Sequence, residues 1–181
     1  PNAPTGIALA LADIEEILQH NPEQLVVIDE AYVDFGAESA VSLLDKYDNL
    51  LVVQTLSKSR SLAGARVGLA ISNKEIIEDL NRIKFSFNPY NLNRLSILAG
   101  TEALKDVEYF NDTRTRIMET REDFVAQMEQ LGFTVLPSKA NFVFATHPDM
   151  AGQTYFEKLR ERQIIVRHFK DPKICEYVRI T

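Results

Sequence analysis

The stretch LLVVQTLSKSRSLAGARVG, residues 50–68, decides the fold, because it joins a short apolar run to a loop that carries a lysine and an arginine. The apolar run at 50–53 is typical of a strand buried in a parallel sheet, and a second such run lies at 25–28. Ligands bind beyond the carboxyl ends of the strands in sheets of this kind. We therefore expect the residues that follow the two runs, Asp29, Tyr32 and Lys58, to face one pocket.

Helices and strands alternate along the first part of the chain. Apolar residues recur at helical spacing from Leu11 to Leu18 and predict a helix before the strand at 25–28. Further strands are expected at 50–55 and 67–71, and the sequence Ser72-Asn73-Lys74-Glu75 reads as a capping box that opens the next helix. This alternation predicts an α/β fold with a mainly parallel sheet between helical layers, an α/β/α arrangement.

The second part of the chain has its own pattern. A helix is expected from Asn91 onward, with its apolar positions at Leu92, Leu95, Ile97, Leu98 and Leu104. A long amphipathic helix follows near 106–131, and Gly132 is placed to end it. Beyond it we expect a small α+β domain, with strands near 133–136, 141–146, 163–167 and 177–180 and a helix near 151–162. Residues 1–105 then form part of a large domain, and residues 106–181 form a small one.

Composition limits the classes of function. The chain has 181 residues and a formal net charge of -6, which offers no basic face for nucleic acid. No apolar run approaches the roughly 20 residues that span a bilayer. The single cysteine allows no disulfide framework, and the three histidines lack metal-ligand spacing. We expect a soluble, cytoplasmic protein that acts on small molecules, without a metal site.

The residue types at the strand ends match the needs of pyridoxal phosphate, a cofactor that acts as an electron sink. Lys58 can hold the cofactor covalently and then act as a general acid and base. Asp29 can favour the protonated ring nitrogen by charge attraction. Tyr32 and Asn2 can donate hydrogen bonds to the phenolate oxygen. Hydroxyls and a guanidinium suited to the phosphate are offered by Thr55, Ser57 and Arg66.

Each of these motifs also has an ordinary structural interpretation. An Asp-Glu pair after a strand is commonly a helix cap, and a Ser-Lys dipeptide is commonly part of a solvated loop. Four motifs in this order and at these spacings arise far less readily by accident than any one of them. Together they favour a cofactor site.

The motifs also resemble those of a known enzyme family. PNAPTG at 1–6, DEAY at 29–32, Ser57-Lys58 and AGARVG at 63–68 are similar to motifs of fold-type I pyridoxal-phosphate aminotransferases, along essentially the whole chain. Within that superfamily, the segments VIDEAYVDF, FNPYNLN and YVRIT resemble the histidinol-phosphate aminotransferase family most; they lie at 27–35, 87–93 and 177–181.

The resemblance implies a reaction and a set of roles. The family transfers an amino group between L-histidinol phosphate with 2-oxoglutarate and imidazole-acetol phosphate with glutamate, in histidine biosynthesis, as a cytoplasmic homodimer. The resemblance implies the roles stated above for Lys58, Asp29, Tyr32, Asn2, Ser57 and Arg66. Thr55 is an additional residue that would bind the phosphate. Arg179 corresponds to the arginine of the small domain that holds the substrate's anionic group. Asn141 lies on a strand of that domain and has no assigned chemical role.

The resemblance also implies that residues 1–105 are the carboxyl-side part of a large cofactor-binding domain. The chain begins at Pro1 without a methionine and stops at Thr181 inside an expected strand. We therefore expect it to be a fragment that lacks an N-terminal part and ends within the small domain. Such a fragment would bind cofactor weakly, turn over poorly by itself and expose apolar surface where other strands pack.

Other functions remain open at this point. An aminotransferase of the same branch that acts on phenylalanine or tyrosine would share the same catalytic parts, and a decarboxylase of a phosphorylated amino acid is a more distant alternative. A non-catalytic, effector-binding half of a transcription regulator would need a DNA-binding segment, and no basic helix-turn-helix is visible here.

Overall fold

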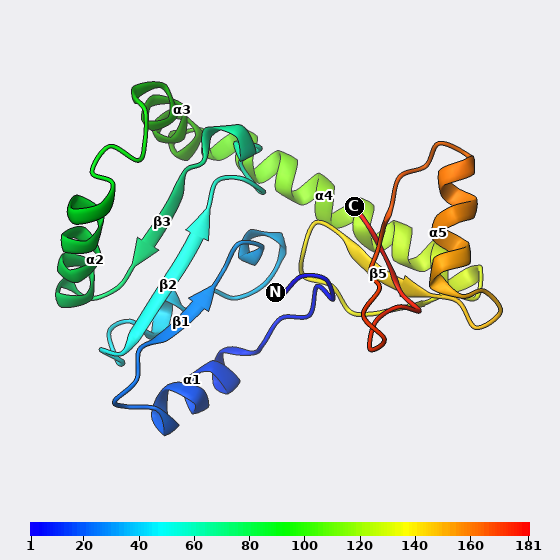
Figure 1. The fold of residues 1–181 in the computed structure, drawn as a ribbon, viewed down its shortest axis with the longest axis horizontal. Coiled ribbons are helices and arrows are strands. Elements are labelled where there is room, and N and C mark those ends of the chain that lie inside the picture. The colour runs from blue at the N-terminus through cyan, green and yellow to red at the C-terminus, as the bar shows by residue number, and fades with distance from the viewer.

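A computed structural model describes residues 1–181 and contains two β-sheets with a long helix running between them (Figure 1). The first sheet has the strand order β1-β2-β3, formed by Val26–Asp29, Leu50–Thr55 and Gly68–Ile71. The strands β1 and β2 are parallel, as the two apolar runs predict. This pairing places the carboxyl ends of both strands at one edge of the sheet.

The third strand runs against the expected direction. β3 pairs with β2 in antiparallel register, with Thr55 opposite Gly68. Residues 56–67 contain only the short 3-10 helix η3 (Ala63–Ala65). Because a parallel pairing needs a crossover connection, usually a helix, this compact loop returns the chain antiparallel. The α/β class is confirmed, while the expected mainly parallel sheet is realised only between β1 and β2.

One face of this sheet packs on helical elements. A core cluster joins α1 (Leu11–His20), η2 (Ala40–Leu43) and β2 through Ile14, Leu18, Ala40, Leu43, Leu50 and Val52. Val26 and Ile28 of β1 pack against the cluster, so strand alternation turns Val27 and Asp29 to the opposite face. Val27 is 52% exposed there. Of the two helical layers expected in an α/β/α arrangement, α1 and η2 form the one that packs on this face of the sheet and contributes to the core cluster.

Two helices follow the sheet. α2 (Lys74–Phe87) and α3 (Arg94–Lys105) are capped by the side chains of Asn73 and Asn93, which accept the backbone N–H of Ile76 and Ser96. The expected capping box with Ser72 as the cap is wrong, because the Ser72 hydroxyl donates to the Leu50 carbonyl instead. The apolar positions expected on α3 are largely exposed in this chain, among them Leu95, Ile97 and Leu98.

The long helix α4 (Val107–Gln130) runs from the α3 side of the first sheet to the second sheet (Figure 1). Gly132 follows its end with φ +87°, and its N–H donates to the Glu129 carbonyl while that of Phe133 donates to Met128. These two bonds form a Schellman motif, which needs a left-handed residue at the glycine position. The expected role of Gly132 at this helix end is therefore confirmed.

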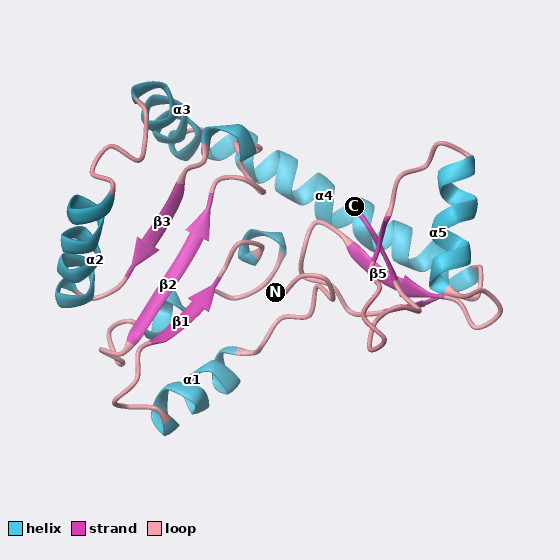
Figure 2. Cartoon of the chain, in the orientation of Figure 1, coloured by secondary structure: helices cyan, strands magenta, loops and turns pink.

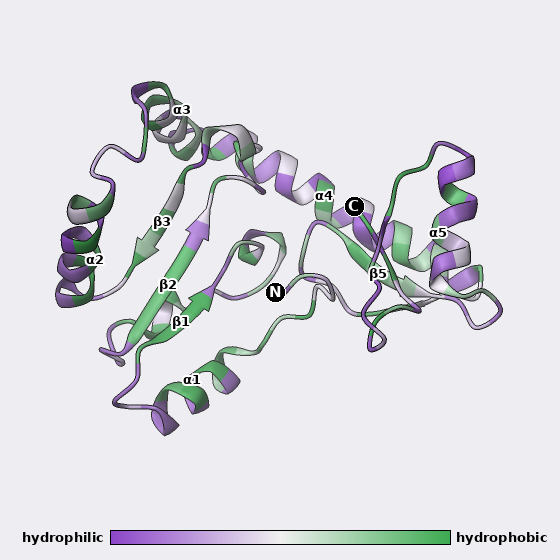
Figure 3. Cartoon of the chain, in the orientation of Figure 1, coloured by the Kyte–Doolittle hydropathy of each residue, from purple (hydrophilic) through white to green (hydrophobic).

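The second sheet is antiparallel throughout and has the order β4-β5-β7-β6. It lies at the other end of α4 from the first sheet (Figure 2). In chain order its strands are β4 (Thr134–Val135), β5 (Val143–Thr146), β6 (Arg167–His168) and β7 (Val178–Ile180). The helix α5 spans Gly152–Glu161, between β5 and β6. The strand β5 is strongly hydrophobic and buried, whereas polar and apolar residues alternate along α4 (Figure 3). The division of the chain into domains at residues 105 and 106 stays a prediction.

None of the helices combines the length and apolarity that crossing a bilayer requires. No three histidine, cysteine or acidic side chains gather in a way that could hold a metal ion.

Candidate active site

Asn2 belongs to a closed turn at the start of the chain. Its backbone N–H donates to the Ile7 carbonyl at 3.0 Å, and its carbonyl accepts the N–H of Gly6 at 2.8 Å. The Thr5 hydroxyl donates to Asn2 Oδ1. The side-chain oxygen is thus occupied, so the Nδ2 amide group is the free donor that Asn2 can offer to a ligand.

Asp29 ends β1 and faces a cavity. Its Oδ1 accepts the backbone N–H of Ala31 at 2.9 Å, and its Oδ2 has no hydrogen-bond partner. The cavity has a volume of 790 Å³ and is lined by Asn2, Asp29 and Tyr32 together with apolar residues of the first turn and of β1. Three of the predicted site residues therefore share one cavity.

Glu30, the residue after Asp29, points inward and connects the end of β1 to β2 and η2 through hydrogen bonds. It is 5% exposed, and its carboxylate accepts hydrogen bonds from Ser39 Oγ at 2.8 Å, from Gln54 Nε2 at 2.8 Å and from the Ala40 N–H at 2.6 Å. Gln54 lies on β2 and Ala40 opens η2. A buried carboxylate with three donors fixes the direction of the chain where Asp29 leaves the sheet.

Replacement of Glu30 by alanine leaves these three donors without their acceptor. We expect the free energy of unfolding to fall by about 3 kcal/mol, because buried donors that lose a charged partner are costly. Urea denaturation followed by circular dichroism measures this loss. Glu38→Ala, a change at an exposed carboxylate eight residues on, is the matched control and should leave the midpoint unchanged. Equal losses in both variants would contradict the role given to Glu30.

Three contacts hold the lysine loop. The Ser59 hydroxyl donates to the Asp34 carboxylate, which lies in the 3-10 helix η1 (Val33–Phe35), and Arg60 Nη1 donates to the Ala103 carbonyl of α3. Gly100 of α3 packs so closely that an added Cβ would lie 3.3 Å from Leu56 Cδ1. The loop is therefore fixed on both sides of Lys58.

Lys58 itself is exposed and directed toward Tyr32. Its Nζ lies 5.5 Å from the centre of the Tyr32 ring, and it makes no ion pair or side-chain hydrogen bond. Its ammonium is therefore available to a ligand. Since Tyr32 also lines the cavity of Asn2 and Asp29, the structure brings these four predicted residues together.

The predicted phosphate ligands are only partly connected to one another. The Thr55 hydroxyl donates to Ser57 Oγ at 2.9 Å and accepts the Ser57 N–H at 3.1 Å, so the two hydroxyls form one group at the end of β2. Arg66 is exposed, has φ +56° and donates to the Ala63 carbonyl within its own turn. No hydrogen bond joins Arg66 to either hydroxyl, and its role as a phosphate ligand stays a prediction.

Arg179 approaches the site from the second sheet. Its guanidinium carbon lies 5.0 Å from the centre of the Phe142 ring, and that ring meets Tyr32 edge-on at 5.2 Å. The Arg179 Nε is buried and has no hydrogen-bond partner. A buried donor without a partner is costly, so an anion that reaches it is bound favourably. Asn141, the neighbour of Phe142, lines a separate cavity of 620 Å³ beside α4.

Three residues that support the site were not predicted from the sequence: Glu30, Asp34 and Arg121. Glu30 and Asp34 lie inside the motif that contains Asp29, but their partners Gln54 and Ser59 follow about 25 residues later. Arg121 is buried in the middle of α4, where helical periodicity alone assigns it to the apolar stripe. A charged residue at an apolar helical position was the available signal for Arg121.

The chain is similar to proteins of known sequence and structure. A histidinol-phosphate aminotransferase 2 of Rhizobium meliloti (strain 1021) is 57% identical over 181 residues, which are all of this chain and 52% of that protein. The solved histidinol-phosphate aminotransferase of Clostridium acetobutylicum has a TM-score of 0.90 and 27% identity over all of this chain and 56% of that one. That of Sinorhizobium meliloti, solved in complex with pyridoxal-5'-phosphate, has a TM-score of 0.88 and 26% identity over all of this chain and 50% of that one.

The chain spans about half the length of the curated relatives that it matches. The family model for aminotransferase class I and II matches residues 1–181, and this match includes both sheets and every candidate site residue. The chain belongs to the aminotransferase class I and II family.

Proposed function

We propose that residues 1–181 carry the lysine, carboxylate and phenol of a pyridoxal-phosphate-dependent aminotransferase. Its reaction would transfer an amino group between L-histidinol phosphate with 2-oxoglutarate and imidazole-acetol phosphate with glutamate, in histidine biosynthesis. The observation that carries the proposal is the free ammonium of Lys58 beside the Tyr32 ring, at a cavity that Asn2 and Asp29 also line. The names of the Rhizobium and Clostridium proteins support the choice of substrate.

The donor set fits the cofactor in its chemistry. Asp29 Oδ2 is free to pair with a protonated ring nitrogen, and Asn2 Nδ2 and the Tyr32 hydroxyl are free to donate to a phenolate oxygen. Thr55 and Ser57 offer hydroxyls to a phosphate. These residues would hold pyridoxal phosphate, with Lys58 as its covalent attachment and Arg66 as a further phosphate ligand.

When bound, the cofactor supplies an electron sink that weakens the bond between the substrate Cα and its hydrogen. Lys58 Nζ would act as the general acid and base that takes the proton from the substrate Cα and gives it back. Asp29 would favour a protonated ring nitrogen through its own negative charge. The Tyr32 hydroxyl would donate to the phenolate oxygen, and the Tyr32 ring lies close to the Lys58 ammonium.

Arg179 is the proposed partner of the substrate's anionic group. A guanidinium binds a phosphate or a carboxylate through two parallel hydrogen bonds, so one arginine serves both histidinol phosphate and glutamate. Its buried, unpaired Nε supports this role, because an anion would supply the missing acceptor.

We also propose that the protein acts in the cytoplasm as a homodimer. The end of α2 and the segment that follows it support an interface, since Phe87 and Tyr90 are each 90% exposed. Large apolar side chains in so exposed a position are typical of a surface that another chain or segment covers.

The substrate is tested by steady-state kinetics on the complete natural polypeptide that contains residues 1–181. With 2-oxoglutarate as acceptor, we expect kcat/KM for L-histidinol phosphate to exceed that for phenylalanine at least about 100-fold, because a site built to bind a polar group rejects analogues that lack it. A preference for phenylalanine would contradict the proposed substrate and assign the chain to the aromatic branch of the family.

A further inference from the structure

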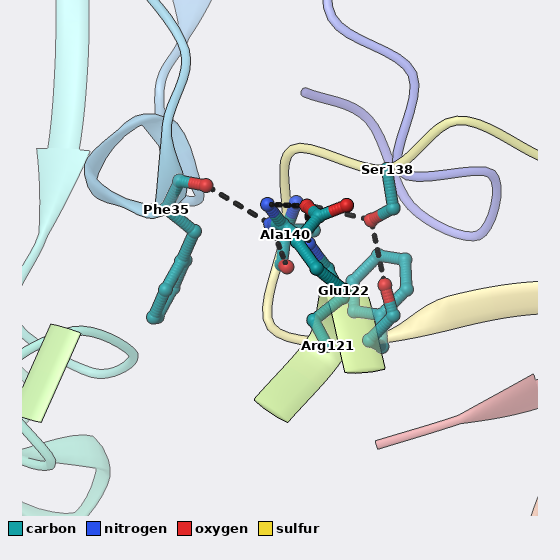
Figure 4. Close-up of polar contacts among 6 residues, drawn as sticks. Phe35, Arg121, Glu122, Ser138 and Ala140 are labelled. Atoms are coloured by element: carbon teal, nitrogen blue, oxygen red, sulfur yellow. Dashed lines mark hydrogen bonds and ion pairs between the residues drawn. The ribbon is translucent and has the colours of Figure 1, made fainter. Parts of the chain in front are cut away.

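Arg121 connects the two halves of the chain from inside α4. Its side chain is 6% exposed. Nη1 donates to two backbone carbonyls, that of Phe35 at 2.9 Å and that of Ala140 at 2.9 Å (Figure 4). The first carbonyl ends η1, and the second belongs to the turn at 138–142 that leads into β5. One nitrogen therefore bridges segments that lie 105 residues apart in the sequence.

The remaining donors of Arg121 point the other way. Nε and Nη2 both donate to Glu122 Oε1, at 3.2 Å and 2.8 Å, and the Glu122 side chain is 66% exposed. The guanidinium is thus neutralised on its solvent side and donates to the two carbonyls on its buried side. This division uses the planar fork of arginine, which the single ammonium of a lysine does not reproduce.

Both bridged segments lead directly to the candidate site. Phe35 comes three residues after Tyr32, and Ala140 comes two residues before Phe142. The Phe142 ring meets Tyr32 edge-on and lies under the guanidinium of Arg179.

The turn at 138–142 is held at its other end as well. The Lys139 N–H donates to the Gly6 carbonyl at 2.9 Å, within the turn of Asn2, and the Ser138 hydroxyl donates to the Phe142 carbonyl at 2.6 Å. Gly6 has φ +80°, and an added Cβ would lie 2.9 Å from Ser138 Cβ. The turn is therefore a rigid spacer between the residues of the first sheet and Arg179.

We infer that Arg121 is a positioning residue, which fixes the spacing between Tyr32 with Lys58 and the anion-binding Arg179 by holding η1 and the turn at 138–142 together. The inference rests on the proposed function, because it takes Arg179 as the residue that binds the substrate's anion. Arg121 touches neither substrate nor cofactor in this scheme. It acts through Phe142.

The test compares Arg121→Met with Met128→Ala in the complete natural polypeptide. Met128 is buried on the same helix, so its loss lowers stability without touching the two carbonyls. We expect the dissociation constant of 2-oxoglutarate, measured by calorimetry on the protein loaded with pyridoxal phosphate, to rise about 10- to 100-fold in Arg121→Met, since a displaced Arg179 loses charge-assisted hydrogen bonds to the anion. The KM for 2-oxoglutarate should rise together with this dissociation constant. Met128→Ala should change neither constant.

Three outcomes are distinguishable. A rise in both constants confined to Arg121→Met supports the positioning role. Constants that match the wild type in Arg121→Met, with a melting temperature lowered as in Met128→Ala, overturn it and leave Arg121 a purely structural residue. A wild-type protein that binds 2-oxoglutarate but does not transaminate contradicts the proposed function alone, because the affinities still compare the variants.

Discussion

Replacing Lys58 with alanine is expected to abolish transamination, with a loss in kcat of at least about 10⁴-fold. Lys58 is asked both to hold the cofactor and to move a proton, and each role alone contributes several orders of magnitude. No other lysine ammonium lies against the Tyr32 ring, so no neighbour substitutes for it. Steady-state turnover of L-histidinol phosphate with 2-oxoglutarate in the complete natural polypeptide measures the loss.

The matched control for this prediction is Lys46→Ala. Lys46 is 63% exposed and pairs with Glu15 on the outside of the first sheet. Its removal should leave kcat unchanged. Because Lys58 is exposed and makes no ion pair, Lys58→Ala should retain the wild-type circular dichroism and, without cofactor, the wild-type melting temperature. Turnover by Lys58→Ala within tenfold of the wild type would refute the assignment of this residue.

Asp29→Asn is expected to lower kcat by about 10²–10³-fold, the range found when one preorganised electrostatic group is removed. Asparagine keeps the shape of the side chain and can still accept the Ala31 N–H through its oxygen, so the local turn is preserved. Its neutral amide no longer favours a protonated ring nitrogen. The effect should therefore appear in kcat while the fold stays intact.

The control here is Asp48→Asn, a change at an exposed carboxylate in the loop before β2. It removes one negative charge from the protein without approaching the cavity. A loss of activity equal in both variants would point to net charge rather than to the position of Asp29. Wild-type activity in Asp29→Asn would contradict the proposed role of this carboxylate.

Secondary structure was predictable where periodicity and caps agree. The apolar spacing from Leu11 to Leu18 predicted α1, and Gly132 marked the end of α4 through its left-handed conformation. The direction of β3 was not predictable in the same way, because an apolar run has the same pattern in parallel and antiparallel pairings. The compact lysine loop decides the direction, and its shape depends on contacts with η1 and α3.

The grouping of four candidate site residues was predictable from residue type and order, while their chemical roles stay predictions. Asn2, Asp29, Tyr32 and Lys58 were each predicted from a motif, and the structure places them together. The contacts that support these residues were not predictable: a charge at an apolar helical position could single out Arg121, but its partners are two backbone carbonyls, which leave no trace in the sequence. The position of Arg66 also depends on local backbone: its side chain bonds to its own turn, which residue type alone does not reveal.

The most direct test of the central claim is to map where pyridoxal phosphate attaches. The complete natural polypeptide is mixed with the cofactor, its absorbance spectrum is recorded, and borohydride reduction is followed by peptide mapping of the modified lysine. Our account predicts a shifted absorbance band and a single label on Lys58, which disappears in Lys58→Ala. A label on another lysine, or no label on a protein that is folded and saturated with cofactor, would contradict it.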